Sequence, residues 1–164
     1  MQDHRFSFEV DAEPEQVWRA LHPPVRHPAT PGKPRVIEHG RVRIEILHEG
    51  DANGDGLIRH CYFPVPKILL SGGVGQSWEW VTQVVPNVSS HYEAVGKPLF
   101  SRAEGWQRFE DLGGGRTRVH FRETYHAFNP ILRTLFERRV HRFISKDNDQ
   151  LIRAAIERAI ARQR

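Results

Sequence analysis

Glu123 is the residue of this sequence whose surroundings most suggest chemistry. It lies between Phe121 and Tyr125 in a segment, 117–127, where apolar and polar residues alternate. Such alternation predicts a half-buried β-strand and places Glu123 on its buried face. A carboxylate there is costly unless it has a partner or a raised pKa. Glu123 is therefore expected either to pair with a basic group near the rim of the sheet or to act as a polar anchor or general acid/base.

Four other side chains could share a proton with Glu123. They lie on segments with the same alternation and are predicted to face the same way: His60, Tyr62, Tyr92 and Tyr125. Histidine, tyrosine and glutamate are the usual general acids and bases. Glu123 and His60 are therefore the candidate catalytic residues, and whether any reaction is catalysed stays open.

Metal and thiol chemistry find little support in the sequence. Cys61 is the single cysteine, and the ten histidines are scattered. The turn at 51–56 resembles the start of a calcium-binding loop, but its twelfth position is Tyr62, where such a loop needs a bidentate glutamate. No metal site and no cofactor are expected.

The alternating patterns predict seven strands and one short helix ahead of a long final helix. The strands are expected at 5–10, 41–46, 57–63, 77–85, 88–95, 99–110 and 117–127. The short helix is expected at 15–21, behind acidic residues and Pro14, with one further helical turn left open in the loop at 22–34. The segment 64–75 is irregular and rich in glycine; whether it is a mobile lid stays open.

A long amphipathic helix is expected from Asn129 and Pro130 to the end of the chain. Asn129 is a favourable N-cap and Pro130 a favourable first residue. Apolar residues then recur at steps of three and four for about nine turns. Polar residues at 145–149 interrupt the stripe, which indicates either a kink or polar groups that face a cavity.

The order of these elements resembles the START-like superfamily, also called SRPBCC, which includes birch-pollen-allergen-like proteins and bacterial polyketide cyclases/dehydrases. The matching segments are Phe6-Ser7-Phe8-Glu9-Val10, Pro14-Glu15-Gln16-Val17-Trp18-Arg19-Ala20-Leu21 and Gly114-Gly115-Arg116-Thr117-Arg118-Val119. The resemblance implies an α+β helix-grip fold, in which a curved antiparallel sheet wraps around the C-terminal helix. We expect one such domain over residues 1–164. Because the superfamily carries many functions, function has to be argued from the site.

A cavity between sheet and helix would hold a small hydrophobic ligand such as a lipid, aromatic or polyketide-like molecule. Its predicted lining is Ile58, His60, Tyr62, Trp78, Trp80, Ser90, Tyr92, Phe121, Glu123, Tyr125, Leu132, Phe136 and Phe143. Apolar walls with a few polar groups are typical of small-molecule sites. The alternative is that these aromatic side chains fill the core. Binding for transport, storage or sensing is the first functional hypothesis, and a polyketide cyclase/aromatase or hydratase is the second.

The net charge of +4 is concentrated in the final helix. Residues 129–164 contain nine lysines and arginines against four aspartates and glutamates. This excess indicates either a solvated helix face or a patch, Arg138, Arg139, Arg142 and Lys146, that contacts an anionic membrane surface. Nucleic acid is the least favoured partner, because no stacking aromatic residues accompany these cations. The oligomeric state is not predicted.

A cytoplasmic location is expected. The first residues, Met1–Arg5, are polar and lack the apolar core of a signal peptide. No apolar run reaches the length that spans a membrane.

Overall fold

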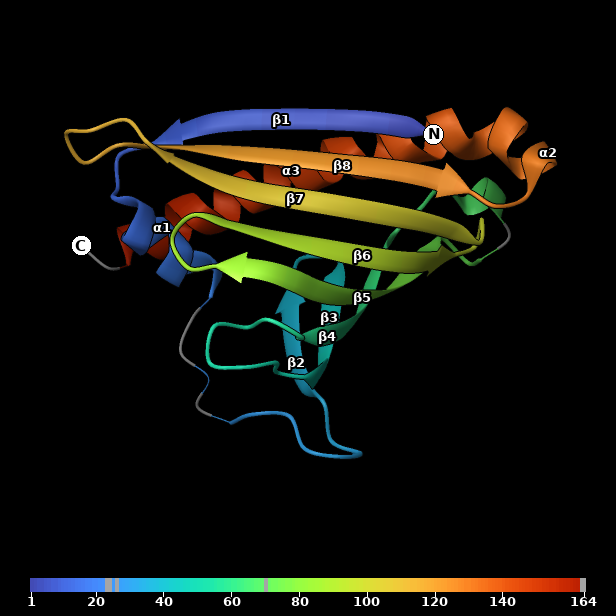
Figure 1. Ribbon diagram of the computed structural model, residues 1–164. Helices are drawn as coiled ribbons and strands as arrows, with labels where there is room; N and C mark the ends of the chain where they lie inside the picture. Colours follow the sequence, from blue (N-terminus) through green and yellow to red (C-terminus); the bar gives the residue numbers. More distant parts are fainter. Residues whose placement is uncertain (23–24, 26, 70, 163–164) are drawn as a thin grey trace.

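The computed structural model describes residues 1–22, 25, 27–69 and 71–162, and it contains one antiparallel sheet crossed by a long helix (Figure 1). The strands follow the order β1-β8-β7-β6-β5-β4-β3-β2, so that only β1 leaves the sequential order to pair with β8. Their bounds are Gln2–Val10 (β1), Arg35–His39 (β2), Val42–His48 (β3), Ile58–Pro64 (β4), Val74–Val85 (β5), Ser89–Lys97 (β6), Ser101–Asp111 (β7) and Thr117–Ala127 (β8).

The α+β helix-grip prediction is confirmed, but the sheet has eight strands rather than seven. The missing strand is β2, which lies at the sheet edge and pairs only with β3. Its apolar residues Val36 and Ile37 are adjacent and both exposed. They therefore do not produce the alternation by which the other strands were recognised.

Among the described residues, one short α-helix, α1 (Pro14–Leu21), follows the first strand. The further helical turn left open at 22–34 falls partly outside the described residues, which omit 23, 24 and 26. Glu13 and Gln16 form a reciprocal capping box, and Pro14 occupies the first turn. Both features stabilise a helix N-terminus. The helix buries Val17 and Trp18 against the sheet and the C-terminal helix. A single turn of 3-10 helix, η1 (Lys67–Leu69), interrupts the predicted irregular segment 64–75, in which residue 70 lies outside the described residues.

The C-terminal helical segment consists of α2 (Pro130–Leu132), a π-helical stretch η2 (Arg133–Glu137) and α3 (Arg138–Ala161). The Asn129 side chain accepts hydrogen bonds from the amides of Ile131 and Leu132, as its position predicted. The helix continues through 145–149, so the polar interruption is not a break. Instead, Ser145 is buried and Asp149 bonds to a strand, which agrees with the expectation of polar groups facing inward.

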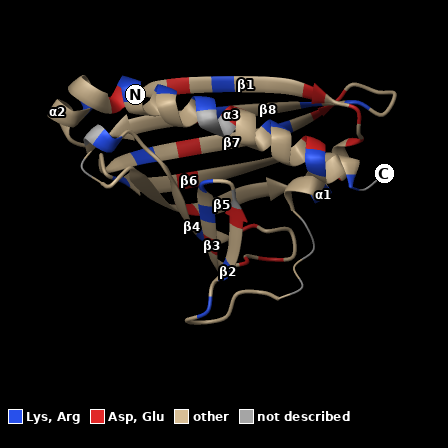
Figure 2. Cartoon of the chain, turned by 180° about the vertical axis from the view of Figure 1, so that it is seen from behind, with Lys and Arg blue, Asp and Glu red and all other residues tan. Residues whose placement is uncertain are grey.

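Seen from behind, α3 runs along the concave side of the sheet (Figure 2). Two apolar clusters hold it there. The larger cluster lies around α1 and includes Phe8, Val17 and Ile156; the smaller lies near α2 and consists of Leu99, Ala127 and Val140. The apolar core is thus divided into two parts along the helix.

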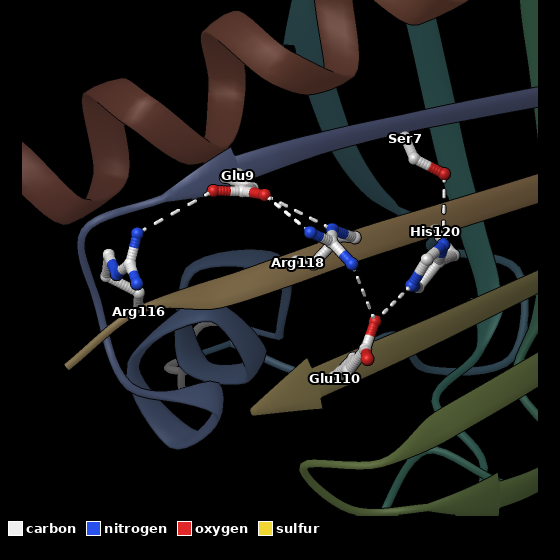
Figure 3. Close-up of polar contacts among 6 residues, drawn as sticks. All are labelled: Ser7, Glu9, Glu110, Arg116, Arg118 and His120. Atoms are coloured by element: carbon white, nitrogen blue, oxygen red, sulfur yellow. Dashed lines mark hydrogen bonds and ion pairs between the residues drawn. The ribbon is translucent and has the colours of Figure 1, made fainter. Parts of the chain in front are cut away.

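The opposite, convex side of β1, β8 and β7 is covered by paired charges. Arg118 bonds to Glu9 at 2.7 Å and to Glu110 at 3.5 Å, and His120 lies between Ser7 and Glu110 at 3.0 and 2.9 Å (Figure 3). These contacts give charged and polar side chains on the outer face of three neighbouring strands their hydrogen-bond partners.

Strand pairing confirms the predicted face of Glu123 and Tyr125 on β8. Glu123 pairs with Gly105 and Tyr125 with Ala103, all on the concave side, while Trp106 pairs with Arg122 on the convex side. Tyr92 on β6 pairs with Gly105 and therefore also faces inward.

The predicted faces of β4 and β5 are wrong. Ile58, His60, Tyr62, Trp78 and Trp80 pair with one another and with Gln76, Glu93 and Val95 on the convex side.

A bulge is the cause of this reversal. Between Thr82 and Val85 the register of β5 against β6 shifts by one residue. A one-residue shift reverses the face of every side chain that follows. A second shift lies between Ile46 and His48 of β3, and Ile44 pairs with Cys61 on the concave side.

Candidate functional site

Polar side chains cross the concave face between the two apolar clusters. We call this set the polar band; it consists of Arg59, Ser77, Glu79, Tyr92 and Glu123 from the sheet and His141 and Ser145 from α3. The strand register places the sheet members on the inner side of β4, β5, β6 and β8. Glu123, Glu79 and Arg59 keep 20%, 13% and 26% of their side-chain surface exposed. The middle of the concave face is therefore not filled by the core.

Tyr92 and Glu123 form the centre of the band. The Tyr92 hydroxyl donates a hydrogen bond to the Glu123 carboxylate, with 2.6 Å between Oη and Oε1. The two residues lie on β6 and β8, and Gly105 of β7 lies between them. A Cβ at residue 105 would overlap the Tyr92 ring. The glycine thus lets the ring lie flat across its strand and reach Glu123.

Arg59 and Glu79 form the second pair of the band. Their side chains approach to 2.7 Å, and the Ser77 hydroxyl donates to the other Glu79 oxygen at 2.6 Å. The Arg59 guanidinium also lies over the Tyr92 ring, 5.6 Å from its centroid. The two pairs are therefore in contact and hold each other in one arrangement.

The helix contributes His141 and Ser145, which are four residues apart and so share one helix face. His141 stacks on Tyr125 at 5.5 Å, and its Nε2 lies 3.9 Å from Glu123 Oε2. Burial, together with the neighbouring His4, lowers the pKa of His141 to about 4. The imidazole is therefore neutral at pH 7, and the contact with Glu123 is not an ion pair.

Burial has the opposite effect on the acidic groups. It raises the pKa of Glu123, although the hydrogen bond from Tyr92 acts against this. It also raises the pKa of Tyr92 well above its usual value, with the carboxylates of Glu123 and Glu79 adding to the effect. Tyr92 therefore keeps its proton and serves as a donor, while Glu123 is an acid of raised proton affinity.

The thiol of Cys61 also faces the concave side, opposite Ser77 of β5. Burial, together with Glu79, raises its pKa to about 12. It is thus a thiol and not a reactive thiolate at neutral pH.

The remaining predicted lining residues fall into two groups. Those that the structure places on the concave side or against its core clusters are Ser90, Phe121, Tyr125, Leu132 and Phe136. Phe143 is 39% exposed and lies in a depression at the helix surface beside Arg139 and Arg142, so the interior position predicted for it is wrong. His60, the second catalytic candidate, lies between Tyr62 and Trp78 on the convex face, away from Glu123.

Sequence reasoning missed Arg59, Glu79 and His141, and it recognised Ser145 only as part of the polar interruption at 145–149. Arg59 and Glu79 would have followed from the alternation of their strands had the bulge in β5 been recognised. His141 and Ser145 carried a signal of their own, because their spacing of four places them on one face of an otherwise apolar stripe.

An opening of about 390 Å³ between β1 and α3 leads to the helix side of the band. Its walls include His141 and Ser145, both buried, and His4, whose ring bonds to Asp149 at 2.9 Å. The rim carries Arg138, Arg142 and Lys146. The opening thus connects the polar band with the charged surface of α3.

Within the described residues, no group of three or more histidine, cysteine, aspartate or glutamate side chains is arranged to hold a metal ion. In the same part of the chain, no helix is long and apolar enough to cross a membrane.

Similarity to known proteins is visible in structure and not in sequence. No protein-family model and no curated protein matches the sequence. Among solved structures, a START superfamily protein from Mycobacterium smegmatis superposes with a TM-score of 0.64 at 13% identity, covering 99% of both chains.

Two further structures give similar values. The ZhuI aromatase/cyclase from Streptomyces sp. R1128 has a TM-score of 0.63 at 17% identity, covering 99% of this chain and 96% of the other. The protein TTHA0849 from Thermus thermophilus has a TM-score of 0.59 at 19% identity, covering 99% of this chain and 100% of the other. The eight-stranded sheet, the helix on its concave side and these superpositions together identify the helix-grip fold of START-like proteins.

Proposed function

We propose that the protein binds a small, mainly apolar molecule on the concave face of the sheet and holds a polar group of that molecule at the Tyr92–Glu123 pair. The observation that carries the proposal is this pair, 2.6 Å apart, fixed across Gly105 between two apolar clusters and still partly accessible. A site with apolar ends and a few oriented polar groups in the middle is typical of small-molecule binding.

The protonation states indicate which ligand groups fit. Tyr92 uses its proton to bond one Glu123 oxygen, which leaves the second oxygen to accept a hydrogen bond from a ligand hydroxyl. Arg59 uses its Nε and one Nη for Glu79, so its other guanidinium nitrogen can donate to a ligand carbonyl. A hydroxyl and a carbonyl on one hydrophobic skeleton would match both groups.

A second function, acid–base catalysis, is favoured by the raised pKa of Glu123. Burial raises the pKa of Glu123 above its usual range, which makes the protonated carboxyl group more accessible as a proton donor during a reaction. The aromatase/cyclase from Streptomyces shows that an enzyme can have this fold. In such an enzyme Glu123 would transfer the proton, and Tyr92 would orient the Glu123 carboxyl group. His60 would take no part, because it lies on the convex face.

The binding experiment compares naphthalene with 2-naphthol, which adds one hydroxyl to the same apolar ring system. The native protein should bind 2-naphthol about tenfold more tightly, as expected for one hydrogen bond to a charged acceptor. Glu123→Leu should abolish this difference while it retains naphthalene binding. Trp78→Phe, on the convex face, is the matched control and should behave like the native protein.

Failure of either compound to bind, or an unchanged preference for 2-naphthol in Glu123→Leu, would contradict the proposal. To separate carrier from enzyme, molecules that copurify with the protein are extracted and incubated again with the native protein and with Glu123→Gln. A mass change produced only by the native protein indicates catalysis; recovery of the same mass from both indicates a carrier.

A further inference from the structure

Exposed apolar and basic side chains meet at one end of the molecule, around α2. We call this region the basic apolar end. Its apolar members are Phe100, Phe128, Ile131, Leu135 and Phe143, and its basic members are Arg138, Arg139, Arg142 and Lys146. In Figures 1 and 2 this is the end at which α2, the N-terminus and the start of α3 come together.

The apolar members are unusually accessible for large side chains. Ile131 is 67% exposed, Phe100 66%, Leu135 57% and Phe128 55%. Phe100 and Phe128 lie on neighbouring loops, since the Phe128 amide donates to the Phe100 carbonyl at 2.9 Å. Phe128, Ile131 and Leu135 follow one another at steps of three and four. Large exposed apolar patches of this kind mark interaction sites.

The basic members are unpaired, unlike most arginines of the sheet. Arg35, Arg59, Arg118 and Arg122 each bond to a carboxylate at 3.0 Å or less. None of the four basic members of the end forms an ion pair with a carboxylate in the described part of the chain. They also border two adjacent depressions, one on the helix surface and one between β1 and α3, so their charges lie side by side.

We propose that the basic apolar end docks on the surface of an anionic lipid bilayer. Unpaired arginine and lysine beside exposed phenylalanine, leucine and isoleucine is the combination that binds a membrane interface: the cations meet lipid phosphates and the apolar side chains enter the headgroup region. The charges alone would fit any polyanion, but the adjacent apolar side chains favour a bilayer.

The docked orientation has a consequence for access to the interior. Arg138, Arg142 and Lys146 lie on the rim of the opening between β1 and α3. When these cations rest on lipid headgroups, the opening faces the bilayer. The docking itself does not depend on which molecule the concave face holds.

Sedimentation with vesicles tests the proposal. The protein should bind vesicles of phosphatidylcholine with 30% phosphatidylglycerol in 50 mM NaCl, bind pure phosphatidylcholine vesicles much more weakly, and dissociate from the anionic vesicles in 500 mM NaCl. Arg138→Gln/Arg139→Gln/Arg142→Gln should weaken binding to anionic vesicles about 100-fold, at about fivefold per charge.

Two further variants make the test specific. Arg153→Gln/Arg158→Gln/Arg162→Gln removes the same net charge from the other half of the same helix, and it should bind within about threefold of the native protein. Phe128→Ser/Leu135→Ser should weaken binding at least about tenfold while the charge is unchanged. Absence of vesicle binding at low salt, or equal losses in the two arginine variants, would overturn the proposal and leave an acidic protein as the better partner.

Discussion

The polar band and the basic apolar end differ in whether their charged side chains have partners within the protein. In the band, Arg59 is paired with Glu79 and Glu123 accepts from Tyr92. At the end, Arg138, Arg139, Arg142 and Lys146 have no carboxylate partner among the described residues. Paired groups are held in one geometry and can therefore position a ligand. Unpaired cations on the surface keep their mobility and their charge, and they are available to a partner that is itself anionic.

The two regions also differ in what their removal should cost. Buried polar groups contribute to stability through each other, since breaking one contact leaves its partner desolvated and unsatisfied. Exposed cations without partners contribute almost nothing to folding. Stability measurements therefore distinguish the two regions before any ligand or membrane is added.

The largest effect is expected for His141 and depends on pH. Because its pKa is about 4 in the folded protein and near 6.5 when unfolded, the unfolded chain binds more protons between these values. The contribution of the buried, neutral His141 to the free energy of unfolding is complete above pH 6.5 and is lost as the pH falls to 4. His141→Phe removes this loss. Between pH 7 and pH 4 its free energy of unfolding should therefore rise by about 3 kcal/mol relative to that of the native protein.

Urea unfolding of both proteins across this pH range measures the difference. The raised pKa of Glu123 acts in the opposite sense, favouring the folded state as the pH falls, but both proteins share it. Parallel stability curves for the two proteins would show that the pKa of His141 is the same in the folded and unfolded states, and would contradict the prediction.

A smaller effect is expected for Gly105→Ala. The added methyl group would overlap the Tyr92 ring, which has to move and give up its bond to Glu123. Overpacking of this kind costs about 2 kcal/mol in the free energy of unfolding. In Gly105→Ala/Tyr92→Leu the smaller side chain leaves room, so the two changes should cost less together than separately. Strict additivity would mean that residue 105 does not position the tyrosine.

The smallest effect on the free energy of unfolding is expected at the basic apolar end. Arg138→Gln/Arg139→Gln/Arg142→Gln should change the free energy of unfolding by less than about 0.5 kcal/mol, because these side chains are exposed and unpaired. Chemical denaturation at pH 7 checks this. A loss of more than about 1 kcal/mol would reveal contacts within the folded protein and weaken the contrast between the two regions.

Side-chain faces were predicted correctly on the strand whose alternation is uninterrupted. On β8 the faces of Glu123 and Tyr125 followed from the pattern alone. On β4 and β5 the same reasoning placed two tryptophans and His60 on the wrong side. The bulge at 82–85 adds a single residue that carries no sequence mark of its own, and its effect passes from β5 to β4 through strand pairing.

The resemblance of the element order to START-like proteins implied the helix-grip architecture. The sequence by itself determined most of the strands, both main helices, the N-cap of the C-terminal helix, and Glu123 as a carboxyl group on a buried face. These features depend on local periodicity and on residue types at fixed positions, which are properties of short segments. The tertiary structure decided which groups meet Glu123. Tyr92 comes from β6, Arg59 and Glu79 from strands whose faces a bulge had reversed, and His141 from a helix that packs across the sheet. Those contacts depend on register and packing between distant segments, which no short segment encodes.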